Sequence, residues 1–114
     1  MASYKTARMA EDLKREISAI IRSLKDDRIT TMLSVIKVVV AGDLSFAKVY
    51  VSDIGGSEAS QRAVEGLTHA TGYIRKNLAD RLHLRKAPEL RFIVDDSLEY
   101  SSHINSILDK LNRG

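Results

Sequence analysis

Cysteine is absent from this chain of 114 residues, and proline, aromatic residues and long apolar runs are scarce. The lack of cysteine excludes disulfides, thiolate zinc sites and thiol nucleophiles, and it fits a reducing compartment such as the cytoplasm. The longest apolar run, Val38 to Ala41, is far shorter than the ~20 residues of a membrane span. The N-terminus runs into charged residues without the apolar segment of a signal peptide. We therefore expect a cytoplasmic protein with no membrane partner.

Patterns that carry catalysis or hold metals are missing as well. The histidines His69, His83 and His103 form no H-x-x-x-H or H-x-E grouping, and metal sites need clustered ligands. Asp95 and Asp96 are adjacent at the end of a predicted strand, so their side chains point to opposite faces and cannot converge as a catalytic pair. No glycine-rich phosphate loop and no G-x-S-x-G motif occurs. We expect no metal, no cofactor and no enzymatic activity.

Charge is polarised along a chain of otherwise ordinary globular composition. The length predicts one domain over residues 1–114, large enough to fold without disulfides. The formal net charge of +3 favours an anionic partner only modestly. Residues 62–91, however, hold seven lysines and arginines against three acidic residues, whereas residues 92–112 hold one lysine and four acidic residues. This polarity predicts that one surface meets a polyanion.

Apolar residues at spacings of three and four predict two long helical segments. The first covers residues 6–24 and presents one apolar stripe. The second covers residues 57–82, with Ser57 as its N-cap, and keeps helical phase through Gly72. An interior glycine costs about 1 kcal/mol relative to alanine. The second segment is therefore two helices in near-continuous phase or one kinked helix, with the joint at Ala70-Thr71-Gly72.

Three segments have the composition of strands: residues 33–40, 47–51 and 89–95. Gly42 and Asp43 can take the dihedrals of a hairpin turn between the first two. Alternation predicts a core face with Ile36, Val38, Val40, Ala47, Val49 and Val51. The opposite, partly wet face is predicted to carry Lys37, Lys48 and Tyr50.

Asp96 with Glu99 resembles a capping box and predicts a last helix near the C-terminus. The element order is then helix, strand, strand, helix, kink, helix, strand, helix. One three-stranded sheet with its helices on one face makes this a two-layer α+β domain.

The basic stretch after the helical joint is the remaining candidate for a functional site. A kink at Gly72 would expose backbone N–H groups where a phosphate can bind, and neighbouring cations would add sequence-independent affinity for nucleic acid. The predicted RNA-binding residues are Ala70, Thr71, Gly72, Arg75, Lys76, Arg81, Arg85 and Lys86. The alternative interpretation is that these cations lie on a helical face that contacts only solvent, since such a face would carry the same charge. Only Tyr50 clearly combines an aromatic ring with an exposed strand face, so recognition of RNA shape or backbone is favoured over base stacking.

Several segments, taken in this order, resemble the ribosome-binding factor A family of bacterial small-subunit maturation factors. The matching segments are Asp43 to Val51, Ala70-Thr71-Gly72-Tyr73-Ile74-Arg75, Leu82-His83-Leu84-Arg85, Pro88-Glu89-Leu90-Arg91-Phe92 and Asp95-Asp96-Ser97. The resemblance implies a type II KH-like fold in a monomeric, non-catalytic assembly factor. It also implies binding to the free small (30S) ribosomal subunit, contact with 16S rRNA, and support for late maturation and processing of that RNA.

Ordinary KH domains clamp the nucleic-acid backbone with a G-x-x-G loop between two helices. This chain has no such loop, because Gly66 and Gly72 are six residues apart. The resemblance implies that the Ala-x-Gly kink of the family stands at this place, matched here by Ala70-Thr71-Gly72. We therefore expect this segment to contact the surface of a structured RNA, and not to bind single-stranded bases as an ordinary KH domain does.

Two other functional classes remain as alternatives. A protein–protein adaptor on a KH-like scaffold would use the wet sheet face with Lys37, Lys48 and Tyr50, or the first helix. A small nuclease or RNA-modifying enzyme would depend on Asp95 or His83. Salt-insensitive binding to a protein would favour the adaptor, and metal-dependent turnover would favour the enzyme.

Overall fold

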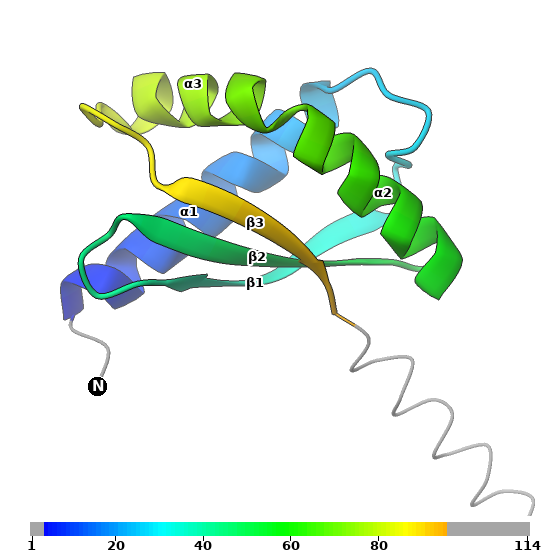
Figure 1. Cartoon of the computed structure of the whole chain (residues 1–114), viewed down its shortest axis with the longest axis horizontal. Coiled ribbons are helices and arrows are strands. Elements are labelled where there is room, and N and C mark those ends of the chain that lie inside the picture. Colours follow the sequence, from blue (N-terminus) through cyan, green and yellow to red (C-terminus); the bar gives the residue numbers. More distant parts are fainter. Residues whose placement is uncertain (1–3, 96–114) are drawn as a thin grey trace, which may run out of the picture.

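A three-stranded mixed sheet with helices packed on one face is the architecture of residues 4–95, the part of the chain that the computed structural model describes (Figure 1). The elements are α1 (Tyr4–Ser23), β1 (Leu33–Val40), β2 (Phe46–Asp53), α2 (Ser57–His69), α3 (Thr71–Leu82) and β3 (Glu89–Val94). β1 is antiparallel to β2, and β3 is parallel to β2 on its other side. The pair α2–α3 is therefore the crossover connection that a parallel pair of strands requires.

The predicted α+β class and element order are confirmed up to β3, and they are those of a type II KH-like domain. The predicted capping box at Asp96 and Glu99, and the last helix after it, lie outside the described residues.

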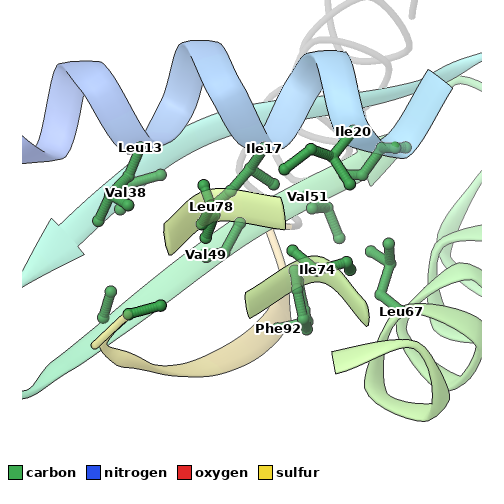
Figure 2. Close-up of a cluster of buried hydrophobic side chains, with 13 residues drawn as sticks. Leu13, Ile17, Ile20, Val38, Val49, Val51, Leu67, Ile74, Leu78 and Phe92 are labelled. Carbon is green, nitrogen blue, oxygen red and sulfur yellow. The ribbon is translucent and has the colours of Figure 1, made fainter. Parts of the chain in front are cut away.

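The core lies between the sheet and all three described helices, as Figure 2 shows. α1 presents the apolar stripe that its sequence predicted, with Leu13, Ile17 and Ile20 almost fully buried. The other helices and the strands complete the cluster with Leu67, Ile74, Leu78, Val38, Val49, Val51 and Phe92. Burying an aliphatic side chain of this size stabilises the fold by about 1.5–3 kcal/mol. Because the apolar face of each element is buried in the core, only the side chains on its other faces are available to bind a partner.

A bulge in β1 corrects one predicted core position. Val35 pairs with Val51 and Lys37 pairs with Tyr50, so Ile36 has no partner of its own on β2. An extra residue of this kind interrupts the alternation of faces along the strand. Ile36, predicted to be a core residue, is half-buried and does not belong to the core cluster.

The hairpin turn uses a different residue from those predicted. The chain turns over residues 41–44, where the Leu44 N–H donates to the Ala41 carbonyl at 2.9 Å. Leu44 adopts the left-handed conformation with φ of 62°, whereas Gly42 and Asp43 do not. Asp43 instead accepts hydrogen bonds from the hydroxyl and the N–H of Ser45, and these lower the pKa of its carboxyl.

The start of α2 also differs from the prediction. Gly56 is the N-cap, with φ of 111°, and Ser57 is the first helical residue without a capping hydrogen bond. A positive φ at this position favours glycine because it has no Cβ. The buried carboxylate of Asp53 holds the junction before the helix by accepting hydrogen bonds from the Thr30 hydroxyl at 2.5 Å and the Gly55 N–H at 2.7 Å. These bonds tie the loop after α1 to the entry of α2.

Candidate nucleic-acid interface

The joint between α2 and α3 is a single residue, Ala70, at which the helical axis changes direction (Figure 1). The Ala70 N–H donates to the Gly66 carbonyl at 3.0 Å, and the Ala70 carbonyl accepts from the Ile74 N–H at 3.0 Å. The hydroxyl of Thr71 donates to the Leu67 and Thr68 carbonyls at the end of α2. The joint is thus a bend with hydrogen bonds running across it, and the Ala70 N–H is not free for a phosphate.

Gly72 is exposed in the first turn of α3, and nothing lies within 4 Å of the place where a Cβ would stand. Its φ is not positive either. Neither backbone conformation nor packing among residues 4–95 requires glycine at this position, although glycine is a poor helix former. Gly66 differs, because a Cβ there would lie 3.1 Å from Cγ1 of Ile29. Of the two glycines, only Gly66 is explained by the packing of the described residues.

Lys76 lies one helical turn beyond Gly72, so the two share the face of α3 opposite the buried Ile74 and Leu78. Lys76 is exposed, and no hydrogen bond or ion pair engages it within the described residues. Asp80, a further turn along, reduces the positive charge of this face. Tyr73, beside Gly72, is 52% exposed and was missed by the sequence analysis. The signal that could have found it was its place immediately after the predicted joint.

Arg85 and Lys86 lie in the loop between α3 and β3, beyond the left-handed His83 that ends the helix. Both are exposed, and neither forms a hydrogen bond or ion pair within residues 4–95. A helix of 12 residues is about 18 Å long. The predicted site residues therefore form a strip along α3, from the joint at one end to this loop at the other, and not one cluster.

Arg75 belongs to the strip in sequence but its guanidinium turns inward. Its Nε donates to the Pro88 carbonyl at 3.1 Å and its Nη2 to the Ala87 carbonyl at 2.8 Å. The side chain is half-buried, and Ala87 and Pro88 are buried. Arg75 therefore holds the loop that carries Lys86 against α3.

We expect Arg75→Gln to lower the free energy of unfolding by about 1.5–3 kcal/mol, because hydrogen bonds from a charged donor to buried carbonyls would be lost. Urea denaturation followed by circular dichroism measures the change. Lys76→Gln, at the neighbouring exposed position, should remain within about 0.5 kcal/mol of the wild type. Equal unfolding curves for Arg75→Gln and the wild type would show that these hydrogen bonds do not stabilise the fold.

Arg81 is also engaged, but at the surface. Its Nη1 donates to Oε2 of Glu16 on α1 at 3.2 Å, and this hydrogen bond is the main cause that lowers the pKa of Glu16. The Arg81 side chain is 44% exposed. Exposed ion pairs are weak and screened by salt, so a phosphate can compete with Glu16 for Arg81.

The part of the chain that the structure describes contains no cluster of metal-binding side chains. Within residues 4–95, no three histidine, aspartate or glutamate side chains gather closely enough to hold a metal ion. A pocket of about 540 Å³ lies between the end of α1 and the start of β1, and its lining contains Ser18, Arg22 and Thr30 but no carboxylate or histidine. None of the helices in residues 4–95 combines the length and apolar character needed to cross a membrane.

Comparison with known proteins identifies similar chains. A family model described as ribosome-binding factor A matches residues 5–108. The chain is 46% identical to the ribosome-binding factor A of Clostridium tetani over 112 residues, which cover 97% of this chain and 93% of that protein. The crystal structure of ribosome-binding factor A from Thermus thermophilus is similar with a TM-score of 0.69 and 30% identity, over 78% of this chain and 93% of that chain. A homology model of the Thermus thermophilus factor, fitted into the cryo-EM map of its complex with 30S, is similar with a TM-score of 0.64 and 30% identity, over 76% of this chain and 91% of that chain.

Proposed function

The chain belongs to the ribosome-binding factor A family, and from this premise we propose that it binds the free 30S ribosomal subunit, contacts 16S rRNA and assists late maturation and processing of that RNA. It acts as a cytoplasmic monomer and without catalysis of its own. The proposed contact surface is the α3 strip, defined as Ala70, Thr71, Gly72, Lys76, Arg81, Arg85 and Lys86. Arg75 is not part of the contact surface, but its hydrogen bonds to the Ala87 and Pro88 carbonyls hold the loop with Lys86 against α3.

The observation that carries the proposal is an exposed glycine and an unpaired lysine on α3, together with two unpaired cations in the loop that follows it. Gly72 leaves the backbone at the joint uncovered, so a phosphate or ribose can approach closely. Lys76, Arg85 and Lys86 have no anionic partner among the described residues and are available to phosphates. The bend without a G-x-x-G loop suits a structured RNA surface better than a single strand.

Sedimentation of the protein with purified subunits tests the proposal. We expect it to sediment with free small subunits and not with intact ribosomes, and the bound fraction should fall as the salt concentration rises. Equal binding to both particles, or binding to neither, would contradict the proposed function.

Gly72→Ala should separate stability from binding. Alanine at an exposed helical position with open space around its Cβ should raise the free energy of unfolding by up to about 1 kcal/mol. The same methyl group should weaken binding to free small subunits several-fold, because it holds the RNA away from the joint. Urea denaturation and sedimentation measure the two effects.

Gly66→Ala is the matched control for the stability effect. Its Cβ would meet Ile29, so we expect no comparable gain in stability. If the Gly72→Ala variant binds subunits as well as the wild type does, the joint is not part of the contact surface.

A further inference from the structure

The sheet face that points away from the core carries two aromatic rings set among cations. Phe46, Lys48 and Tyr50 share this face along β2, because the residues between them are fully buried in the core. Lys37 is the partner of Tyr50 on β1, and Arg91 is the partner of Lys48 on β3. From the sequence, Tyr50 is the one aromatic residue predicted on this face. Phe46 joins it because β2 begins one residue earlier than predicted.

Neither ring serves the core. Phe92 belongs to the core cluster, whereas Phe46 and Tyr50 are half-buried and lie outside it. Each ring instead has a cation above it: Nζ of Lys37 is 4.6 Å from the centre of the Tyr50 ring, and Cζ of Arg91 is 5.2 Å from that of Phe46. Cation–π contacts are weak at exposed sites, so a nucleotide can replace them.

The charge of this face is complementary to a polyanion. Lys37, Lys48 and Arg91 are exposed on it, and Glu89 is the single acidic residue among the outward-facing positions of β1, β2 and β3. The three described helices pack on the opposite side of the sheet through the core cluster, so they leave the rings and cations uncovered. Interleaved rings and cations on an open sheet are the combination with which proteins bind single-stranded RNA.

We propose that this outer sheet face, defined as Lys37, Phe46, Lys48, Tyr50 and Arg91, binds a single-stranded RNA segment. Unpaired bases stack on Phe46 and Tyr50, which are about 13 Å apart along the strand, and Lys48 between them binds the intervening phosphate. Stacking of this kind tolerates many sequences because every base has a π-face. The proposal rests on the RNA-contacting function proposed above and adds a second surface, on the layer opposite the α3 strip. The domain would then meet RNA from two sides.

Titration of fluorescein-labelled octauridine with the full-length chain, followed by fluorescence anisotropy, tests the proposal. Phe46→Leu and Tyr50→Leu remove the rings but keep charge and apolar character. We expect affinity to fall about fivefold for each and about 25-fold for the double variant. Lys48→Gln should lower affinity and reduce the slope of log K against log salt by about one. Lys14→Gln, an exposed residue of α1 outside both proposed surfaces, is the matched control and should bind like the wild type.

Urea midpoints of all variants show whether a loss of binding reflects loss of folding, and Lys48→Gln changes an exposed side chain that the core does not use. Octauridine binding that is absent in the wild type, or unchanged in the double ring variant at equal stability, would overturn the proposal. So would a ring-dependent, salt-insensitive association with a small-subunit protein after nuclease treatment. Sedimentation with free small subunits distinguishes the two proposals: its absence contradicts the proposed function, whereas ring-independent octauridine binding contradicts only the second surface.

Discussion

Replacing Lys76 and Lys86 together with glutamate should lower affinity for free small subunits on the order of 100-fold near physiological salt. Both side chains are exposed and have no anionic partner in residues 4–95, so each is available to a phosphate. Reversing the charge of these two side chains replaces two attractions to RNA phosphates with two repulsions. The slope of log K against log salt should also fall by at least about two, because two phosphate contacts disappear. Sedimentation at several salt concentrations measures both quantities.

The matched control carries the same change in net charge on another surface. Arg8→Glu with Lys14→Glu reverses two exposed cations on α1. We expect a much smaller loss of binding from this variant. An equal loss in both double variants would mean that only the net charge of the protein attracts the subunit. Unchanged binding in the α3 variant would exclude the strip as the RNA surface.

Leu78→Ala should lower the free energy of unfolding by about 2–5 kcal/mol. The side chain is fully buried, and it is one of only two buried residues of α3, with Ile74. A truncated side chain leaves a cavity against α1 and the sheet that the backbone cannot fill completely. For a domain whose whole stability is about 5–15 kcal/mol, this is a large fraction.

Urea denaturation measures the effect of Leu78→Ala, and Lys76→Ala on the exposed face of the same helix is its control. Hydrogen exchange should show α3 losing protection before α1 does, because the cavity weakens the few contacts that hold α3. A loss of less than about 1 kcal/mol would contradict the assignment of Leu78 to the tightly packed core.

Helical periodicity, strand composition and the interior Gly72 were together sufficient to predict the order of the described elements and the site of the helical joint. α1 and the α2–α3 pair have apolar residues at regular spacing. The helix predicted over residues 6–24 therefore agrees closely with α1, and the joint predicted at Ala70-Thr71-Gly72 includes the observed joint at Ala70. The bulge at Ile36 has no such signal, because a β-branched residue fits either face of a strand. Composition also could not show that Leu44, and not Gly42, takes the left-handed conformation.

The candidate site was predictable as a charged segment but not residue by residue. Arg75 and Lys76 are adjacent and equally basic in sequence, yet one donates to carbonyls about a dozen positions further along the chain and the other is exposed. That difference depends on where the loop before β3 passes α3, which is a tertiary property. Phe46 was missed for a related reason, since its face depends on where β2 begins.

Site-specific photo-cross-linking tests the central claim most directly. A photoreactive residue is placed at Lys76 on the α3 strip or at Lys14 on α1, and each protein is irradiated in complex with free small subunits. We expect position 76 to cross-link to 16S rRNA and position 14 to do so far less. Cross-links from position 76 to ribosomal proteins alone, or RNA cross-links from position 14 alone, would contradict it.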